Sequence, residues 1–272
     1  MKKYITIMSM FAACFALADD EVYDGQTISS MDFSNAKLNY SSWRNANIYS
    51  SNNFTGASLR EADFTGATIS VNKFANANLK DSIFDKSTCY GAKFDGANLT
   101  NASFLDAKLT YSSSSYGYAT SFVGSNLTNA KLSGLTFSSS LYNVSFKNAN
   151  LRNADLSDGV FTSGRSTSKC DFDGADLTGT NFTNAKLANT AKDNSTLQTI
   201  YLSNVVSLQN TIINNTNFTG ATLCVYYDGA HFVDFSNMTL TEANFTNAIL
   251  SAKNWSGTSS CSVSFSNAKL IN

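Results

Sequence analysis

The sequence predicts an all-β protein built as a parallel β-helix, a solenoid in which short strands stack coil upon coil. Three observations predict it: large apolar residues recur at every fifth position, phenylalanines recur at every tenth, and the 272 residues include no proline. Stacked short strands have few sites that tolerate a missing N–H, so the absence of proline fits a regular β array.

The five-residue period is clearest between residues 54 and 109. Every fifth residue there is apolar or cysteine: Phe54, Leu59, Phe64, Ile69, Phe74, Leu79, Phe84, Cys89, Phe94, Leu99, Phe104 and Leu109. Two places before each stands a small or short polar residue, such as Ala57 or Asn52. Residues two apart on an extended chain point the same way, so both face inward while the others meet water or turn a corner. An α-helix cannot place every fifth residue on one face.

The alternation of phenylalanine with aliphatic residues predicts the number of sides. Four sides for each coil place the phenylalanines on two opposite walls and the aliphatic residues on the other two. The coil is then about twenty residues long, and about twelve coils form a rod of ~60 Å. Several glycines stand two places after a large residue, where a turn with positive φ favours glycine or asparagine; they are Gly56, Gly66, Gly96, Gly124, Gly174, Gly179, Gly220 and Gly257.

The repeat unit also resembles that of a known family. The units Ala97-Asn98-Leu99, Ala154-Asp155-Leu156, Ala175-Asp176-Leu177 and Ala62-Asp63-Phe64 are similar to the Ala-Asp/Asn-Leu motif of the pentapeptide-repeat family, and the resemblance covers roughly residues 26 to 272. It implies a right-handed quadrilateral β-helix. The repeat changes phase several times, but each shift is short enough to be a bulge or loop, so we expect residues 19–272 to form one domain.

The first eighteen residues have the pattern of a secretory signal peptide. Lys2 and Lys3 precede an apolar run, and Ala16-Leu17-Ala18 is a small-x-small cleavage site, which predicts cleavage after Ala18 and a periplasmic or secreted protein without an integral membrane segment. An alternative is a lipoprotein signal, because Phe11-Ala12-Ala13-Cys14 resembles a lipoprotein box that would anchor the chain through Cys14.

The sequence predicts no catalytic, cofactor-binding or metal-ligating residues, and therefore no enzyme. His231 is the only histidine, which excludes a cluster of histidine ligands, and we expect it to be a surface or wall residue. The acidic residues are scattered without a convergent pair. The Asn-x-Thr triplets at Asn53, Asn98 and Asn126 arise from the repeat itself, so we interpret them as coincidental glycosylation motifs.

Four cysteines follow the predicted signal peptide. Cys89 takes the place of a large inward residue and Cys170 that of a small one, which indicates buried apolar fillers about four coils apart. Cys224 and Cys261 lie outside the inward rows and nearly two coils apart. We expect free thiols, because these separations do not suit disulfide geometry.

Two functions are compatible with this architecture. The first is a non-catalytic extracytoplasmic scaffold that binds an unknown protein or envelope partner through projecting loops such as 111–121 and 162–170, although these are equally well explained as tolerated insertions. The second follows from the resemblance: some family members imitate DNA and bind type II topoisomerases such as gyrase.

The charge disfavours the second function. Full imitation of DNA needs on the order of thirty negative charges along ~60 Å, whereas the formal charge is −1, or −3 after removal of Lys2 and Lys3. Lysines interrupt any acidic stripe, namely Lys37, Lys73, Lys93, Lys108, Lys131 and Lys186. We therefore expect no nucleic acid partner and no imitation of one.

The C-terminal end predicts self-association. Phe265, Ala268 and Leu270 keep the repeat almost to the last residue, without a capping helix after them. Because an open end exposes unpaired strand edges, we expect an end-to-end homodimer.

Overall fold

A computed structural model provides the fold. It describes residues 3–4, 19–49, 52–110, 119–137, 144–161, 170–187, 206–208, 211–226, 230–232, 235, 238–253, 260–263 and 265–271. All regular elements in these ranges are strands, and none of these residues belongs to a helix that could cross a membrane.

The strands are two or three residues long. They are β1 (Lys3–Tyr4), β2 (Glu21–Val22), β3 (Thr27–Ser29), β4 (Asn47–Tyr49), β5 (Thr68–Ser70), β6 (Thr88–Tyr90), β7 (Lys108–Thr110), β8 (Thr136–Phe137), β9 (Cys170–Asp171), β10 (Val206–Ser207), β11 (Ile213–Asn214), β12 (Cys224–Tyr226), β13 (Ala230–Phe232), β14 (Thr239–Thr241), β15 (Ser251–Lys253), β16 (Ser260–Ser262) and β17 (Lys269–Ile271).

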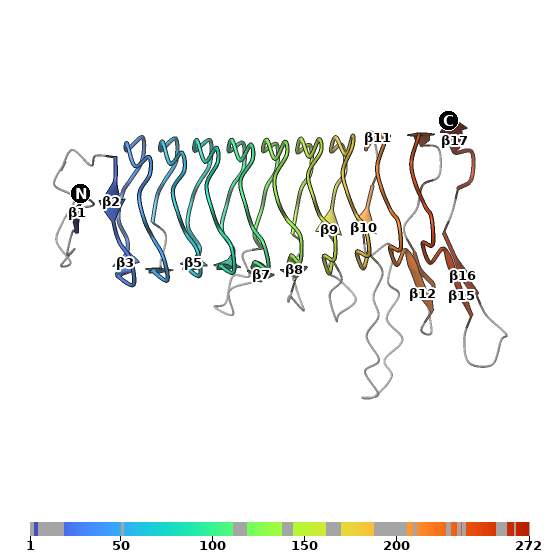
Figure 1. Cartoon of the computed structure of the whole chain (residues 1–272), viewed down its shortest axis with the longest axis horizontal. Helices are drawn as coiled ribbons and strands as arrows, with labels where there is room; N and C mark the ends of the chain where they lie inside the picture. The colour runs from blue at the N-terminus through green and yellow to red at the C-terminus, as the bar shows by residue number, and fades with distance from the viewer. Residues whose placement is uncertain are drawn as a thin grey trace.

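Parallel pairing between successive coils makes the molecule a long solenoid (Figure 1). The largest sheet runs β3-β4-β5-β6-β7-β8 in sequence order, and each strand pairs with the strand one coil further along the chain. The register keeps like residues together, for example Ile28 opposite Ile48 and Ile69 opposite Cys89. The predicted parallel β-helix is therefore confirmed.

Four ladders of parallel bridges run along the axis. Ladder 1 begins Asp32–Asn53–Lys73, ladder 2 begins Lys37–Ser58–Asn78, and ladder 3 begins Val22–Ser42–Asp63. Ladder 4 is the β3–β8 sheet and its continuation through Val160 and Lys186. Ladder 3 continues to Asn244 and joins ten residues, one from each coil, and ladder 4 continues to Ile249. The estimate of about twelve coils stays a prediction.

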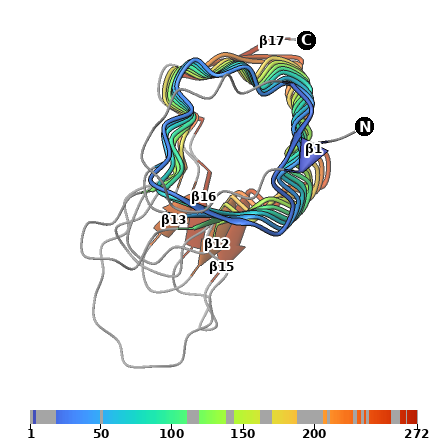
Figure 2. The same cartoon turned by 90° about the vertical axis from the view of Figure 1, so that its left-hand side faces the viewer.

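Aromatic rings fill the interior in two rows. In the row from Phe33 to Phe172, neighbouring rings stack with centroids 4.7–5.0 Å apart, which is the spacing of stacked strands. The second row contains Trp43, Phe64, Phe84 and Phe104, and it meets the first edge to face, as between Phe64 and Phe74 at 89°. The end-on view in Figure 2 shows the superposed coils that enclose this core.

The insertions all leave the solenoid at one corner. The inward residues of ladders 1 to 4 follow one another at five-residue intervals, and the long intervals fall only between ladder 4 and the next ladder 1, as from Leu109 to Phe122 and from Leu187 to Leu208. Two of these insertions contain antiparallel pairs, β12 with β13 and β15 with β16 (Figure 2). They differ from the predicted parallel pairing because in each pair two strands that follow one another in the chain run antiparallel.

Candidate functional site

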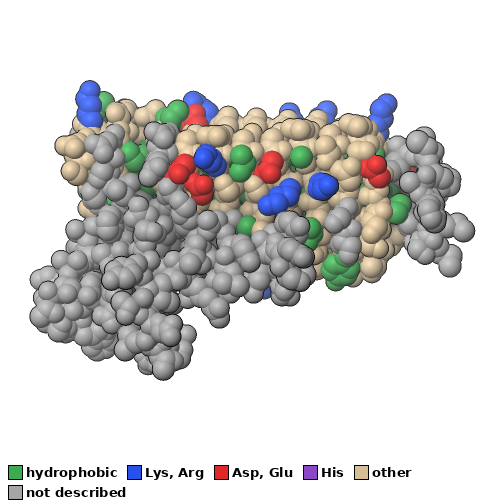
Figure 3. Space-filling view, turned by 180° about the vertical axis from the view of Figure 1, so that it is seen from behind, with side chains coloured by type: hydrophobic (Ala, Val, Ile, Leu, Met, Phe, Trp, Pro, Cys, Tyr) green, Lys and Arg blue, Asp and Glu red, His purple; other side chains and the backbone are tan. Residues whose placement is uncertain are grey.

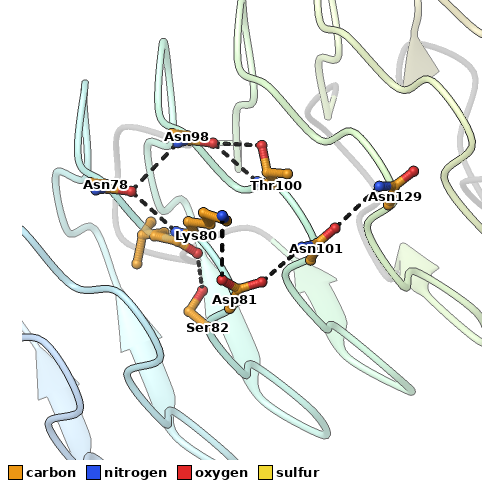
Figure 4. A network of polar contacts seen from close by, with 9 residues as sticks. Asn78, Lys80, Asp81, Ser82, Asn98, Thr100, Asn101 and Asn129 are labelled. Atoms are coloured by element: carbon orange, nitrogen blue, oxygen red, sulfur yellow. Dashed lines mark hydrogen bonds and ion pairs between the residues drawn. The ribbon is translucent and has the colours of Figure 1, made fainter.

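Most corners of the coils are built from asparagine, aspartate or glycine in the left-handed region of φ. Asp81, Asn101 and Asn129 occupy the same corner of three successive coils with φ of 61°, 59° and 59°. Their side chains hydrogen-bond along the axis: the Asn101 amide donates to Asp81 at 2.8 Å, and that of Asn129 donates to Asn101 at 3.2 Å (Figure 4). The predicted glycine turns have positive φ as well, except Gly257, which lies outside the described residues.

A second polar ladder lies on the outward face of ladder 2. Asn98 Oδ1 accepts hydrogen bonds from the backbone N–H of Thr100 at 3.2 Å and from its hydroxyl at 2.7 Å (Figure 4). Asn126 and Thr128 repeat the pair one coil later at 3.1 and 2.6 Å. The Asn-x-Thr triplets therefore close local turns, a structural role that the interpretation as coincidental motifs had missed.

The same pairing continues on ladder 3 near the C-terminal end. Asn181 binds Thr183, Asn217 binds Thr219 and Asn244 binds Thr246, each hydroxyl donating at 2.6 or 2.7 Å. The Asn217 amide also donates to Thr183 in the preceding coil at 2.9 Å. These two outward faces are thus satisfied largely by their own side chains.

The outward face of β3–β6 is different. It carries Thr27, Ser29, Asn47, Tyr49, Thr68, Ser70, Thr88 and Tyr90. The Tyr49 hydroxyl donates to Asn47 at 3.2 Å, while the five threonine and serine hydroxyls have no hydrogen-bond partner among the described residues. This face is the candidate functional site, because its polar groups are available to a ligand.

Charged side chains of both signs alternate along the rod. Arg44 Nε donates to Asp63 at 2.5 Å, and Arg152 pairs with Asp176 at 3.2 Å. The face in Figure 3 shows blue and red groups interspersed rather than gathered by sign. Burial raises the pKa of Asp63, but hydrogen bonds from Thr65 and Arg44 outweigh it and hold the pKa of that carboxyl below its usual value. These charges stabilise neighbouring coils locally and form no acidic face in this view.

Of the lysines predicted to point outward, Lys93 behaves differently from the others. Its Nζ donates to the carbonyl of Ala119 at 2.7 Å, and desolvation lowers the pKa of its amine. Ala119 belongs to the predicted 111–121 loop, of which the structure describes residues 119–121. The rest of that loop, residues 111–118, and residues 162–169 of the predicted 162–170 loop lie outside the described residues. The lysine therefore fixes the end of this insertion to the solenoid.

Two polar groups near the N-terminal end are buried without a partner. Glu21 Oε2 and Tyr23 Oη make no hydrogen bond among the described residues. Burial, and secondarily the Glu21 carboxylate, raises the pKa of Tyr23 above its usual range. The Tyr23 ring stacks on Trp43 at 3.9 Å, so these groups begin the aromatic core.

The cysteine predictions are confirmed where the structure describes the side chains. Cys89 and Cys170 are buried free thiols, and burial raises the pKa of Cys89 to about 12. Cys224 lies in β12 and Cys261 in β16; their free state stays a prediction. His231 lies in β13. Across the described ranges, histidine, cysteine, aspartate and glutamate form no group of three that could hold a metal ion.

Comparison with known proteins agrees with the period and the ladders. The family model of pentapeptide repeats matches eight copies, at residues 32–66, 52–85, 72–101, 120–162 and 163–190. The chain belongs to the pentapeptide repeat family. No curated protein sequence matches it closely.

Several solved pentapeptide repeat proteins are similar in structure. HetL, involved in heterocyst differentiation regulation in the cyanobacterium Nostoc sp. strain PCC 7120, is 19% identical over 86% of this chain and 87% of its own, with a TM-score of 0.38. QnrB1, a plasmid-mediated fluoroquinolone resistance protein, is 14% identical over 91% and 92%, with a TM-score of 0.30. A protein of the Arabidopsis thaliana thylakoid lumen is 28% identical over 42% and 69%, with a TM-score of 0.20. Sequence identities and TM-scores this low support no conclusion about function.

Proposed function

We propose that this pentapeptide repeat protein is a non-catalytic, extracytoplasmic scaffold: a right-handed, quadrilateral rod of about twelve coils, exported by a signal peptide at residues 1–18 that is cleaved after Ala18. The observation that carries the proposal is the bonding of outward side chains to one another from coil to coil, as in Asp81–Asn101–Asn129. Such ladders stiffen a rod and present a regular surface, which suits a binding scaffold better than a catalytic site.

The experiment is the intact mass of the natively expressed protein in each cell fraction. A species that begins at Asp19 in the periplasm or medium supports the proposal. A lipidated species that begins at Cys14 makes the rod membrane-anchored. An uncleaved cytoplasmic chain overturns the extracytoplasmic assignment.

The topoisomerase-binding alternative has less support. A DNA mimic needs a face with one sign of charge, whereas Arg44 and Arg152 neutralise Asp63 and Asp176 along the rod. The purified protein should leave DNA supercoiling by gyrase unchanged at micromolar concentration. Inhibition of supercoiling, or protection of gyrase from a quinolone, would favour the alternative.

We also propose end-to-end dimerisation through the C-terminal coil. Leu270 is 68% exposed in the last strand, β17, which pairs with β14 on one side. Phe245 and Phe265 are only partly buried, although they continue the aromatic rows. A second copy would cover these residues. Light scattering should give a dimer mass at micromolar concentration, and a monomer mass throughout would contradict it.

A further inference from the structure

We propose that the β3–β6 face, defined by the eight outward residues of these four strands, binds an extended β-1,4-linked polysaccharide that lies along the solenoid axis. The inference rests on the proposed extracytoplasmic function, because such polymers occur at cell envelopes and surfaces. It identifies the class of partner for the scaffold and the residues that would contact it.

The first argument is the spacing of two tyrosines in one column of the sheet. Ser29 is in register with Tyr49, and Ser70 with Tyr90, so the outward column runs Ser29, Tyr49, Ser70 and Tyr90 through consecutive coils. Tyr49 and Tyr90 are two strand spacings apart, or roughly 9.6 Å. Two pyranose rings of an extended β-1,4-linked chain have a comparable length, so every second ring of such a chain, presenting the same face each time, would meet successive tyrosines.

The second argument is the side-chain conformation of Tyr49. The ring is 40% exposed, and its hydroxyl reaches Asn47 two residues earlier on the same strand at 3.2 Å. The side chain therefore lies down along the strand instead of projecting into solvent. An aromatic ring held in this way loses little conformational freedom when a sugar packs against it.

The third argument is that hydroxyls on this face are free. Thr68, Ser70 and Thr88 flank the tyrosines without an intramolecular hydrogen bond in the described chain. Several threonines next to ladders 2 and 3 are occupied instead, as Thr100 is by Asn98 and Thr183 by Asn181. Since a hydroxyl both donates and accepts, the free row matches the hydroxyls of a sugar chain.

The fourth argument is charge. None of the eight outward residues of β3–β6 is ionisable at neutral pH, and the first charge in the sheet is Lys108 in β7. Nucleic acids require basic contacts, and the centre of a protein interface is usually more apolar than a row of threonine and serine. A neutral, hydroxyl-rich polymer fits this face better than either.

The experiment measures binding of the full chain to chitin and to cellulose by sedimentation, and to soluble chitin oligosaccharides by calorimetry, with amylose as the α-linked control. We expect binding to at least one β-1,4-linked polymer and tighter binding of a hexasaccharide than of a disaccharide, because only the longer ligand spans both tyrosines. Tyr49→Ala and Tyr90→Ala should each weaken binding about tenfold, or ~1.4 kcal/mol.

The matched control is Tyr40→Ala. Tyr40 is 45% exposed but belongs to the corner of ladder 2, so its removal should leave binding unchanged. Equal losses in all three variants, no dependence on ligand length, or no binding of the wild-type chain to any β-1,4-linked glycan would overturn the inference. These results are independent of cell fraction, so the inference can fail while an Asp19 N-terminus in the medium still supports the scaffold.

Discussion

Asn45 Oδ1 lies 2.5 Å from the position that a Cβ on Gly66 would occupy, so an asparagine in one coil packs directly on a glycine in the next. Gly66 also has a φ of +68°, which a residue with a Cβ adopts at a cost. We expect Gly66→Ala to lower the free energy of unfolding by about 2 kcal/mol, from backbone strain plus displacement of Asn45. Denaturant unfolding of the variant and the wild type, monitored by circular dichroism, measures this difference in the free energy of unfolding.

Gly124 provides the control for this prediction. Its φ is +64°, but nothing lies within 4 Å of an added Cβ, because the preceding coil has Gly96 at the same corner. Gly124→Ala should therefore cost only the strain, about 1 kcal/mol. Equal costs for the two variants would show that the contact with Asn45 is unimportant.

Asn72 is expected to stabilise the early coils through a buried amide ladder. Its Oδ1 accepts from the backbone and side-chain amides of Asn52, both at 2.9 Å, and its Nδ2 donates to the carbonyl of Ile48 at 2.7 Å. Asn72→Ala leaves these buried groups unpaired, and we expect a loss of about 2 kcal/mol in the free energy of unfolding. Asn78→Ala, on the outward face, should change it by less than about 0.5 kcal/mol. A loss no larger than that of the control would refute the role of the ladder.

These residues also show what the sequence could predict. The period placed Asn52 and Asn72 in the inward row of small residues, and both are fully buried. It could not predict their bonds, because the carbonyl that Asn72 binds belongs to a residue 24 positions earlier. Repetition fixes which way a side chain points, since every coil repeats the same geometry. The partner of a polar group depends on the residue that stands in the neighbouring coil.

The candidate site illustrates the same limit. The outward direction of Tyr49 and Tyr90 follows from the inward positions of Ile48 and Cys89. Their alignment in one column depends on the register across β4, β5 and β6, in which Ile48 pairs with Ile69 and Ile69 with Cys89 although the two intervals differ by one residue. The hydroxyls that remain without a partner on this face could be identified only from the hydrogen bonds in the structure.

Cys89 should resist thiol reagents in the folded protein. Its side chain is fully buried, and burial raises the pKa of the thiol to about 12, so almost no thiolate forms at pH 8. After treatment of the native full chain with iodoacetamide, mass spectrometry of peptides should find Cys89 unmodified, and modification should require denaturant. Ser29→Cys, at an exposed position, should be modified at once. Rapid native labelling of Cys89 would contradict its burial.

The same thiol predicts loss of stability at alkaline pH. The unfolded chain releases the Cys89 proton near pH 9, while the folded chain holds it to about 12. The contribution of the neutral thiol is therefore complete below pH 9 and declines as pH rises through this window, by about 1.4 kcal/mol per pH unit. Cys89→Ala should show a shallower decline in the free energy of unfolding between these limits. Parallel curves for the variant and the wild type would count against the prediction.

Asp63 predicts the opposite dependence, a loss of stability in acid. Its pKa is lowered in the folded state because the hydrogen bonds from Thr65 and Arg44 outweigh the effect of burial. A lowered pKa gives stability that is present above the unfolded value of ~3.9 and is lost as pH falls through the folded value. Asp63→Asn should therefore reduce the free energy of unfolding by about 1 kcal/mol at neutral pH and by progressively less below pH 4. In an Arg44→Gln background the neutral-pH difference should shrink, because one partner of the carboxylate is already missing. An effect of Asp63→Asn that is independent of pH would mean that the carboxylate is not stabilised by its charge.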